Sequence, residues 1–332
     1  MRNLRQMLSK SYISSKLIRK FPNWSLRLSP SRSLSIEASC ACNINCYSCP
    51  VGNRLIKGHN MELDDFCKIL DLLPSHILKL DFSHRGDPTM NPNLAKMVQL
   101  AHKKGIITDV YTNGLFLDRH IDGLVESGLD ILRVDLDGAS QKSYLSYRVN
   151  SNYEKVKSNI RALVEARSKS KGKFPKKLLM ICVVSAFNEN EISDIQKMAE
   201  DLGVDEVLFK TMYINYGTKY YHDAATQKKI APKNKAYRRA IRAKDFLCPF
   251  LWRGSILYNG DLQLCTCDFE GEYVLGNILK ENSFEKVYYN QRANSLRKQV
   301  VNHTGSLCKA CAVVGSNHYI PSINKKFVRQ KI

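Results

Sequence analysis

Short hydrophobic runs alternate with amphipathic stretches along residues 33–210. Six runs rich in aliphatic and β-branched residues are predicted strands: Leu34–Ala38, Ile77–Phe82, Ile107–Tyr111, Ile131–Leu136, Lys177–Val184 and Glu206–Lys210. Five stretches between them space their hydrophobic residues as helices do: Leu63–Leu73, Leu94–Lys103, Arg119–Ser127, Tyr153–Arg167 and Glu191–Leu202. Strands that alternate with helices predict a parallel sheet, either an α/β layer or an open barrel. In such folds the reactive side chains gather at the carboxyl ends of the strands.

The alternation stops near residue 212, and a different pattern begins after a polar, basic connector. Ser255–Tyr258 and Asp261–Leu264 flank Asn259-Gly260, a pair that tolerates the positive φ of a type I′ turn and so predicts a β-hairpin. We therefore divide the chain into five parts: a basic N-terminal extension (1–32), an α/β barrel (33–225), a basic linker (226–247), a small cysteine-rich module (248–312) and a basic tail (313–332).

Length and composition exclude two classes of protein. With 332 residues, of which 44% are hydrophobic and 25% charged, the chain can bury a large core and is not disordered throughout. Its longest apolar runs are under about 10 residues, whereas a helix that crosses a bilayer needs roughly 20. Fifty-one Lys and Arg against 31 Asp and Glu give a net charge of +20, which favours anionic partners.

Part of this charge lies at the N-terminus. Residues 1–36 contain eight basic residues and no acidic one, and an imperfect helical stripe runs through Leu4, Met7, Leu8, Tyr12, Leu17 and Ile18. Three interpretations stay open: a leading helix packed on the domain, a helix that contacts an anionic membrane surface, and an organellar targeting segment.

Two further basic stretches leave a choice between classes of function. Lys169–Lys177 contains Gly172 and Pro175, as an exposed loop would, and residues 228–244 hold eight basic residues without an acidic one. Nucleic-acid binding is one interpretation. A solvated surface that attracts an anionic substrate is the favoured one, because Tyr237 is the only aromatic residue within 228–244 and no known nucleic-acid-binding motif is present.

The cysteines need a separate explanation. Eleven are present, in two groups at 40–49 and 248–311, with only Cys67 and Cys182 outside them. The odd number excludes complete disulfide pairing, and the chain has no apolar secretory segment. Grouped cysteines of this kind predict metal sites in a reducing compartment, hence a cytoplasmic protein.

The first group has the spacing C-x3-C-x2-C, with Cys42, Cys46 and Cys49 just after the first predicted strand. Three thiolates on one short loop can hold three irons of a 4Fe–4S cluster and leave the fourth iron open for another ligand. A closed zinc site is the alternative, since Cys40 can supply a fourth ligand.

Tyr47 follows Cys46, and the resulting pattern C-x3-C-aromatic-x-C resembles the motif of the radical S-adenosylmethionine superfamily. The resemblance runs through most of residues 33–312 and implies a partial (β/α)6 TIM-like barrel. It also implies that the open iron binds the amino and carboxylate groups of S-adenosylmethionine, with Tyr47 against the adenine. In this superfamily the reduced cluster cleaves S-adenosylmethionine to a 5′-deoxyadenosyl radical, which abstracts a hydrogen atom from the substrate.

Later segments resemble further motifs of the superfamily. Arg85-Gly86-Asp87-Pro88 corresponds to Gly-Gly-Glu-Pro, which receives the methionine amino group, and departs from it at its first and third positions. Residues 112–114 resemble its Thr-Asn-Gly segment, and residues 134–138 resemble its Ser-x-Asp-Gly segment. These matches imply contacts with S-adenosylmethionine from Gly86, Asp87, Asn113, Asp135 (ribose hydroxyls) and Arg148 (carboxylate).

The second cysteine group resembles the SPASM/twitch extension that many enzymes of this superfamily carry. Gly260-x4-Cys265 belongs to the predicted hairpin, Cys248 lies upstream, and Cys308-x2-Cys311 lies downstream. This resemblance implies one auxiliary 4Fe–4S cluster held by Cys248, Cys265, Cys308 and Cys311. Cys265 and Cys267 can exchange roles, and a structural zinc ribbon is the alternative.

Together the motifs predict a radical S-adenosylmethionine oxidoreductase that dehydrogenates a sugar, a cyclitol or a similar small molecule, with the auxiliary cluster as electron acceptor. The alternative within the superfamily is a maturase of ribosomal peptides that forms crosslinks or epimerises a residue. There Cys182 is a conceivable thiol hydrogen donor, although a core position is the favoured interpretation. His84 is assigned no role.

The alternative of another class is a basic nucleic-acid-binding protein with structural metal sites. The expected partners of the enzyme are a small-molecule substrate, for which the net charge favours an anion, or a peptide. A reducing electron donor such as flavodoxin or ferredoxin is also expected. Contact with a membrane through the N-terminal helix is compatible with the sequence.

Overall fold

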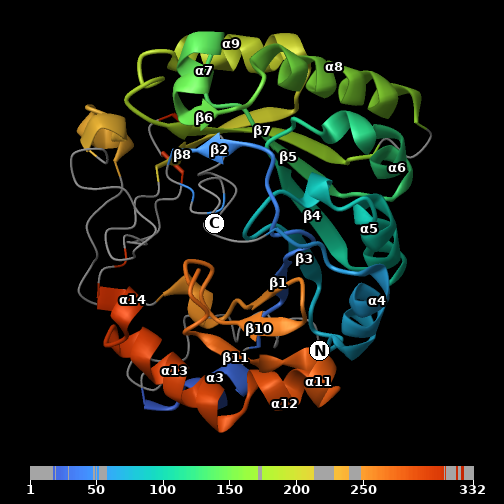
Figure 1. Ribbon diagram of the computed structural model, residues 1–332, viewed down its shortest axis with the longest axis vertical. Coiled ribbons are helices and arrows are strands. Elements are labelled where there is room, and N and C mark those ends of the chain that lie inside the picture. Colours follow the sequence, from blue (N-terminus) through green and yellow to red (C-terminus); the bar gives the residue numbers. More distant parts are fainter. Residues whose placement is uncertain are drawn as a thin grey trace, which may run out of the picture.

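The computed structural model of the chain describes residues 18, 20–28, 30–47, 49, 51, 58–170, 174–212, 228–238, 248–309, 311, 319–320 and 323–324. Six parallel strands form a curved wall in the order β1-β3-β4-β5-β7-β8 (Figure 1). They are β1 (Ser33–Ile36), β3 (Lys79–Phe82), β4 (Ile107–Thr112), β5 (Ile131–Asp135), β7 (Lys177–Val184) and β8 (Glu206–Thr211). The predicted partial (β/α)6 barrel is therefore confirmed, with all six strands near their predicted positions.

Helices cover the outer face of this wall (Figure 1). They are α4 (Leu63–Leu72), α5 (Leu94–Lys103), α6 (Ile121–Glu126), α8 (Tyr153–Lys169) and α9 (Ile192–Leu202). The predicted helix Arg119–Ser127 is divided, because Leu117–Arg119 forms a separate 3-10 turn, η2. The sequence analysis did not predict α7 (Gln141–Tyr147), whose start is fixed by a capping box between Ser140 and Ser143.

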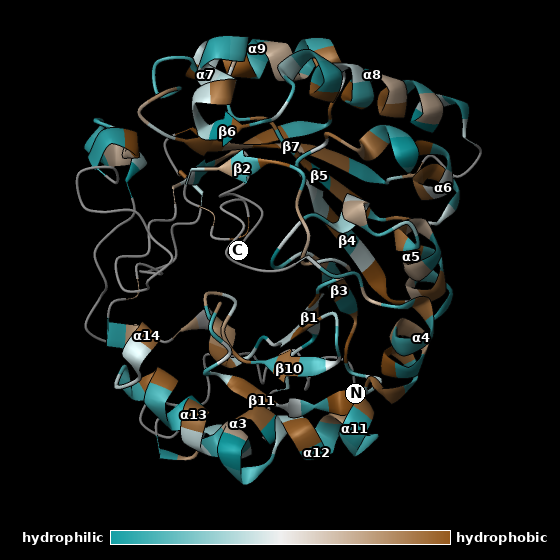
Figure 2. Ribbon diagram, viewed as in Figure 1, coloured by the Kyte–Doolittle hydropathy of each residue, from teal (hydrophilic) through white to brown (hydrophobic). Residues whose placement is uncertain are grey.

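Alternation along the strands separates the core from the barrel interior. On β5, Leu132 and Val134 are fully buried in the main core. On the opposite face Arg133 and Asp135 point into the barrel, as the period of two requires. Hydrophobic residues accordingly gather where the helices face the strands, and hydrophilic residues on the outer helix surfaces (Figure 2).

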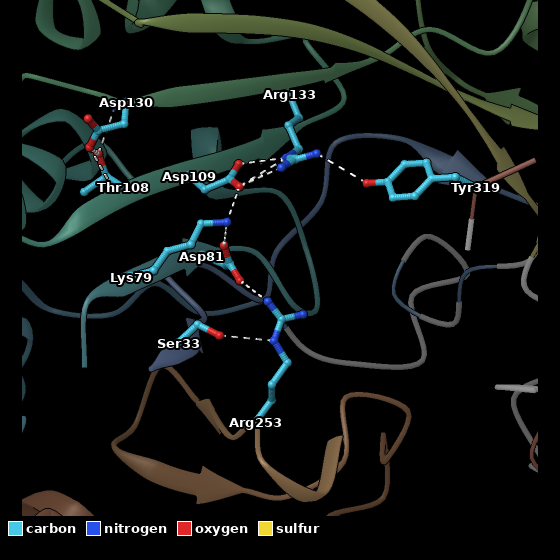
Figure 3. Close-up of polar contacts among 9 residues, drawn as sticks. All are labelled: Ser33, Lys79, Asp81, Thr108, Asp109, Asp130, Arg133, Arg253 and Tyr319. Carbon is cyan, nitrogen blue, oxygen red and sulfur yellow. Dashed lines mark hydrogen bonds and ion pairs between the residues drawn. The ribbon is translucent and has the colours of Figure 1, made fainter. Parts of the chain in front are cut away.

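An ionic network lies inside the barrel (Figure 3). Lys79 Nζ lies 2.7 Å from Asp81 Oδ1 and 2.6 Å from Asp109 Oδ2. Arg133 donates through Nε and Nη2 to Asp109, at 2.9 Å each, and Arg253 Nη2 donates to Asp81 Oδ2 at 2.9 Å. Each buried carboxylate is therefore paired with two cations, which compensates for the loss of solvent.

The C-terminal module continues the barrel sheet. β9 (Ser255–Ile256) pairs parallel with β1, and β10 (Asp261–Gln263) and β11 (Val274–Asn277) follow antiparallel. One nine-stranded sheet results, in the order β11-β10-β9-β1-β3-β4-β5-β7-β8. The module's helices pack below it in Figure 1: α11 (Ile278–Glu281), α12 (Phe284–Tyr288), α13 (Gln291–Asn302) and α14 (Ser306–Lys309).

The hairpin at Asn259-Gly260 is confirmed, but the predicted turn type is wrong. Gly260 has φ +84°, whereas Asn259 is absent from the described non-glycine residues with positive φ, and a type I′ turn needs both. Gly260 N–H donates to Leu257 O, and Leu257 N–H donates to Asp261 O. This pattern fits a three-residue loop in which the left-handed glycine forms a bulge after a type I turn.

The described part of the N-terminal extension packs on the C-terminal module. Helix α3 (Pro22–Leu28) lies against α13, and Ile18 and Leu26 share a buried cluster with Leu251, Trp252 and Val301. This arrangement supports the packed interpretation for residues 18–28. The hydrophobic stripe upstream lies outside the described residues, except for Ile18.

The basic linker and the tail are described only in part, at 228–238 and at 311, 319–320 and 323–324. Within the tail, Asn324 exchanges hydrogen bonds with the backbone of Phe209 on β8, and Tyr319 bridges Lys210. The predicted domain boundaries stay predictions. Among the described residues, no helix is both long and apolar enough to span a membrane.

Candidate functional site

The first cysteine group lies directly after β1. Burial raises the pKa of Cys42 to about 12, and burial also raises the pKa of Cys46, against the attraction of Arg148. The negative charge of Cys49 adds to both shifts, so the three sulfur atoms lie close to one another. Buried thiols that repel one another as thiolates suit a cationic cluster, which stabilises the deprotonated form. Among the described residues, no group of three or more His, Cys, Asp or Glu side chains is arranged so that it could hold a single metal ion.

A two-stranded ribbon holds this loop against Arg148. β2 (Asn45–Cys46) pairs antiparallel with β6 (Arg148–Val149), with Cys46 opposite Arg148. Arg148 Nη1 lies 3.3 Å from Cys46 Sγ, Nη2 lies 3.1 Å from Asp135 Oδ2, and Nε donates to Asp137 Oδ2. The structure therefore brings the predicted site residues Cys46, Asp135 and Arg148 together.

Asp137 is a residue of this site to which the sequence analysis gave no role. Its carboxylate is fully buried, and besides Arg148 it accepts a hydrogen bond from Val183 N at 2.6 Å. Burial raises its pKa, and the charge of Arg148 opposes this. The only signal in the sequence was its position two residues after Asp135. The alternation of a strand puts both residues on one face but does not show whether Asp137 is a site residue or a structural one.

Asn113 connects the end of β4 to the cysteine loop. Its Nδ2 donates to Asn43 Oδ1 at 2.8 Å and lies 3.7 Å from Cys42 Sγ, so its amide points at the first thiol. The Nδ2 of Asn43 is buried and has no hydrogen-bond partner among the described residues. A buried donor without a partner beside three thiols fits a site that is completed by a bound polar group.

Asp87 organises the strand ends around the same site. Its buried carboxylate accepts hydrogen bonds from Thr89 N at 2.9 Å, Thr112 Oγ1 at 3.0 Å and Asn113 N at 2.7 Å. Burial raises its pKa, and these hydrogen bonds oppose the rise. In the structure Asp87 thus joins the ends of β3 and β4, and its contact with the amino group of S-adenosylmethionine stays a prediction.

Gly86 lets two loops approach closely. Its φ is +68°, and a Cβ there would lie 2.5 Å from Ala41 O and 2.5 Å from the carbonyl carbon of Cys40. Asp87 N–H donates to Ala41 O at 2.7 Å across the same contact. Only glycine allows the cysteine loop to rest on the backbone of this turn.

Tyr47 lies at the far side of the cysteine loop. Its ring is tilted by 48° against Phe187, which follows β7, with the ring centroids 6.3 Å apart. Its N–H donates to Tyr147 O at 3.1 Å, next to the β2–β6 ribbon. Phe187 is an aromatic neighbour that the sequence analysis did not single out.

Arg85, a departure from the family pattern, has a buried partner. Its Nε and Nη2 donate to both carboxylate oxygens of Glu37, at 2.6 and 2.9 Å. Glu37 Oε2 also accepts a hydrogen bond from Tyr258 N, in the turn of the C-terminal hairpin, at 3.2 Å. The bidentate ion pair therefore joins the turn that carries Gly86 to the end of β1, and Glu37 links both to the C-terminal module through Tyr258.

His84 makes a second tie to this module. Its Nε2 lies 2.8 Å from Gln263 Oε1, and Gln263 Nε2 donates to the main-chain and side-chain oxygens of Asp268, at 2.5 and 3.0 Å. These bonds fix the orientation of the amide, so His84 Nε2 carries the proton and donates it. The Nδ1 of His84 is buried without a hydrogen-bond partner in the described part of the chain, and the residue has φ 153°. Burial lowers its pKa.

The second cysteine group gathers beside this chain of hydrogen bonds. Burial raises the pKa of Cys248 to about 12, with contributions from the charges of Cys311, Cys308 and Cys267. Cys265 is hydrogen-bonded to Cys267, which together with burial raises its pKa. All five thiols therefore lie in one region, and the choice between Cys265 and Cys267 as a cluster ligand stays open.

Cys182 occupies a core position. Its side chain is fully buried on the helix-facing side of β7, in the same core cluster as Met180 and Val184. The interior-facing residues Leu179 and Ile181 form a different cluster. The structure thus agrees with the core interpretation of this thiol rather than with a hydrogen donor inside the barrel.

Comparison with protein families finds two domains in this chain. A model described as the radical SAM superfamily matches residues 36–199, and a model described as the SPASM iron–sulfur cluster-binding domain matches residues 248–312. The two matches contain both cysteine groups.

Individual curated relatives are similar in sequence to this chain over part of their length. The GTP 3′,8-cyclase of Chlorobaculum tepidum is 30% identical over 124 residues, which are 36% of this chain and 37% of that protein. The chain spans between 37% and 59% of the length of the first three curated relatives.

Solved structures share the fold at low sequence identity. Streptococcus suis SuiB bound to S-adenosylmethionine has a TM-score of 0.62 and 16% identity, over 86% of this chain and 73% of SuiB. BtrN in complex with AdoMet and 2-DOIA has a TM-score of 0.53 and 16% identity, over 86% of this chain and 94% of BtrN.

Proposed function

The chain belongs to the radical SAM superfamily, and we propose that it oxidises an alcohol carbon of a sugar, a cyclitol or a similar small molecule by two electrons. The family matches support one 4Fe–4S cluster that binds S-adenosylmethionine and an auxiliary iron–sulfur cluster. Cys42, Cys46 and Cys49 would hold the first, and Cys248, Cys265, Cys308 and Cys311 the second. When bound, these groups supply a radical that removes a hydrogen atom from the substrate and an acceptor for one electron.

The protein's own side chains would hold both the methionine end and the nucleoside end of S-adenosylmethionine. Arg148 is fixed by Asp135 and Asp137 beside Cys46, where its guanidinium suits a carboxylate of the bound cofactor. Asn43, with its unsatisfied Nδ2, and Asn113 offer amide groups beside Cys42. Tyr47 and Phe187 offer aromatic faces for the adenine.

One observation carries the oxidation: the hydrogen-bonded chain from His84 through Gln263 to Asp268. An alcohol that loses a hydrogen atom and an electron must also release its hydroxyl proton. His84 Nδ1 is unprotonated, buried and fixed by Gln263, so it can accept that proton. Gln263 lies two residues before Cys265, which places the proton acceptor beside the region that takes up the electron.

Two alternatives are less well supported. SuiB is known in complex with a precursor peptide, but at 16% identity its likeness extends to the fold, so peptide maturation rests on that alone. The radical SAM match favours an enzyme over a nucleic-acid-binding protein with structural metals. A reducing protein such as flavodoxin or ferredoxin stays the predicted electron donor.

The product distinguishes these possibilities. We expect the cluster-loaded chain, incubated anaerobically with S-adenosylmethionine, a reductant and deuterated sugars or cyclitols, to transfer deuterium into 5′-deoxyadenosine. The product should be lighter by two hydrogen atoms. A product of unchanged mass would contradict the oxidation and favour epimerisation or rearrangement, and transfer from a peptide alone would favour the maturase.

Two cysteine variants separate the roles of the clusters. Cys46→Ala should abolish 5′-deoxyadenosine formation, because the first cluster loses a ligand. Cys308→Ala should keep 5′-deoxyadenosine formation but lose the oxidised product, because the electron acceptor is removed. Cys67→Ala, on helix α4, is the matched control and should keep both activities. Wild-type product yield in Cys308→Ala would argue against an electron-accepting auxiliary cluster.

A further inference from the structure

Lys210 points into the barrel from the end of β8. It is the last but one residue of the strand and lies on the same face as Leu208, which belongs to the interior cluster with Leu179. Its Nζ lies 5.1 Å from the ring centroid of Tyr111 and 5.7 Å from that of Tyr319. Two aromatic rings therefore flank the ammonium group, an environment that stabilises a cation.

No carboxylate of the described ranges forms an ion pair with Lys210. The charges that act on it most are those of Asp135, Arg133, Asp109 and Asp137, and burial lowers its pKa. These carboxylates are already paired: Asp109 with Lys79 and Arg133, and Asp135 and Asp137 with Arg148. Lys210 is thus a cation whose acidic neighbours are bound to other partners.

The interior network below it adds to this excess of positive charge. Lys79, Arg133 and Arg253 share two carboxylates, Asp81 and Asp109 (Figure 3), and Arg148 is shared by Asp135 and Asp137. Lys210 is therefore a fifth cation beside four carboxylates. Arg133 is saturated by Asp109 and by the hydroxyl of Tyr319, which its Nη1 approaches at 3.4 Å. A partly buried cation without a counter-ion is costly, and an incoming anion removes that cost.

The place of Lys210 is also suitable for substrate. Lys210 pairs in register with Val183 on β7, whose N–H neighbours Asp137 at the carboxyl ends of the strands. This is the end of the barrel at which Arg148, Cys46 and Asn113 meet. A ligand that enters from there meets Lys210 before the ionic network deeper in the barrel.

We propose that Lys210 binds an anionic group of the substrate, a carboxylate or a phosphoryl group, through the ammonium group that the rings of Tyr111 and Tyr319 flank. This inference rests on the proposed function, to which it adds the chemical class of the substrate: a small polar molecule that carries a negative charge. The other end of that molecule then lies toward the cofactor-binding residues, where its hydrogen atom is removed. Lys210 acts as a binding residue and takes no part in the electron transfer.

Anion binding can be measured before the substrate is known. The cluster-loaded full chain is titrated calorimetrically with inorganic pyrophosphate and, separately, with malonate. We expect Lys210→Met to raise the dissociation constant of at least one probe about tenfold, and Lys210→Arg to stay within about threefold of the wild type. If Lys210→Met loses more affinity for pyrophosphate, the substrate group is a phosphoryl group; if it loses more affinity for malonate, the group is a carboxylate.

The matched control removes one positive charge from the surface. Lys68→Met, on helix α4 with a side chain that is 67% exposed, should bind both probes as the wild type does. Equal binding of both probes by Lys210→Met and the wild type would overturn the proposal. So would an equal loss in Lys68→Met, because the effect would then reflect net charge alone.

A second measurement does not depend on a variant that folds. Crystals of the wild-type chain soaked in selenate should show an anomalous selenium peak within hydrogen-bond distance of Lys210 Nζ, and a barrel interior without such a peak would contradict the proposal. Reductive cleavage of S-adenosylmethionine is measured on the same wild-type preparation. Absence of that activity would contradict the proposed function, whereas the titration with the probes tests only whether Lys210 binds an anion.

Discussion

At the scale of single residues, His84 combines three unusual properties. It has a backbone φ of 153°, which non-glycine residues rarely adopt, an imidazole whose Nε2 is fixed by Gln263, and a buried Nδ1 without a partner among the described residues. Strain of this kind persists only where the surrounding structure fixes it, and it gathers at functional sites. The bonds that fix it come from the module that holds the second cysteine group.

The lowered pKa of His84 predicts a pH dependence of stability. Below its ordinary pKa of 6.5 the unfolded chain binds a proton, whereas the buried imidazole stays neutral. The free energy of unfolding therefore falls as the pH drops from 6.5 through the lower pKa of the native state. We expect the apparent melting temperature of the cluster-loaded wild type to fall more than that of His84→Gln between about pH 7.5 and 5.5.

The control for this measurement is His102→Gln, on helix α5, which should retain the wild-type pH dependence. Equal pH dependence in His84→Gln and the wild type would show that the imidazole titrates alike in both states. Burial would then not control its protonation.

At the scale of elements, the site is made of turns that rest on one another. The cysteine loop lies on the turn at Gly86, the β2–β6 ribbon places Cys46 opposite Arg148, and Asp87 joins the ends of β3 and β4. Each contact joins segments far apart in sequence. The sequence shows which residues each turn contains, but the backbone distances between turns arise only when the sheet forms.

Gly86→Ala tests this close approach. Its Cβ would lie 2.5 Å from backbone atoms of Cys40 and Ala41, so we expect the cysteine loop to move and the first cluster to be lost. Iron content should fall, and 5′-deoxyadenosine formation should cease, while the auxiliary cluster stays. Electron paramagnetic resonance and iron analysis of the reconstituted protein measure both.

Gly105→Ala is the matched control. Gly105 has a φ of +74°, similar to that of Gly86, but nothing lies within 4 Å of the position that a Cβ would take. It should cost about 1 kcal/mol of backbone strain and keep both clusters. Loss of the first cluster in both variants would mean that φ, rather than the approach of the two loops, is responsible.

At the scale of the whole molecule, the barrel and the C-terminal module share one sheet. β9 pairs with β1 inside the nine-stranded sheet, and the Tyr258–Glu37 and His84–Gln263 hydrogen bonds join the two regions. Helix α3 also packs the N-terminal segment against α13. The two family domains are therefore continuous in structure, although their motifs are separate in sequence.

This continuity predicts one unfolding transition. Differential scanning calorimetry of the cluster-loaded chain should show a single peak, because separating the module exposes β1 and removes the hydrogen bond of Tyr258 to the buried Glu37. Two resolved peaks would contradict a shared sheet. Arg85→Ala serves as the diagnostic variant: it should lower the transition temperature or divide the peak, since an unpaired buried charge costs about 3–5 kcal/mol.

The sequence alone determined the elements and the chemistry. Periodicity located six strands and most helices, because an element that buries one face has a regular spacing of hydrophobic residues. The spacing of Cys42, Cys46 and Cys49 indicated a cluster-binding loop. The turn at Gly260 was placed correctly but typed wrongly, because its bulge depends on hydrogen bonds between paired strands.

Only the tertiary structure decided which side chains meet. Asp137 reaches Arg148, Gln263 reaches His84, and Tyr319 reaches Lys210 across long stretches of chain, and no local pattern encodes these contacts. The sequence shows which charged residues lie on one face of a strand, but it does not show which of them form ion pairs. Their partners are set by the order and register of the strands, which bring Asp109 to Arg133 and leave Lys210 facing two tyrosine rings.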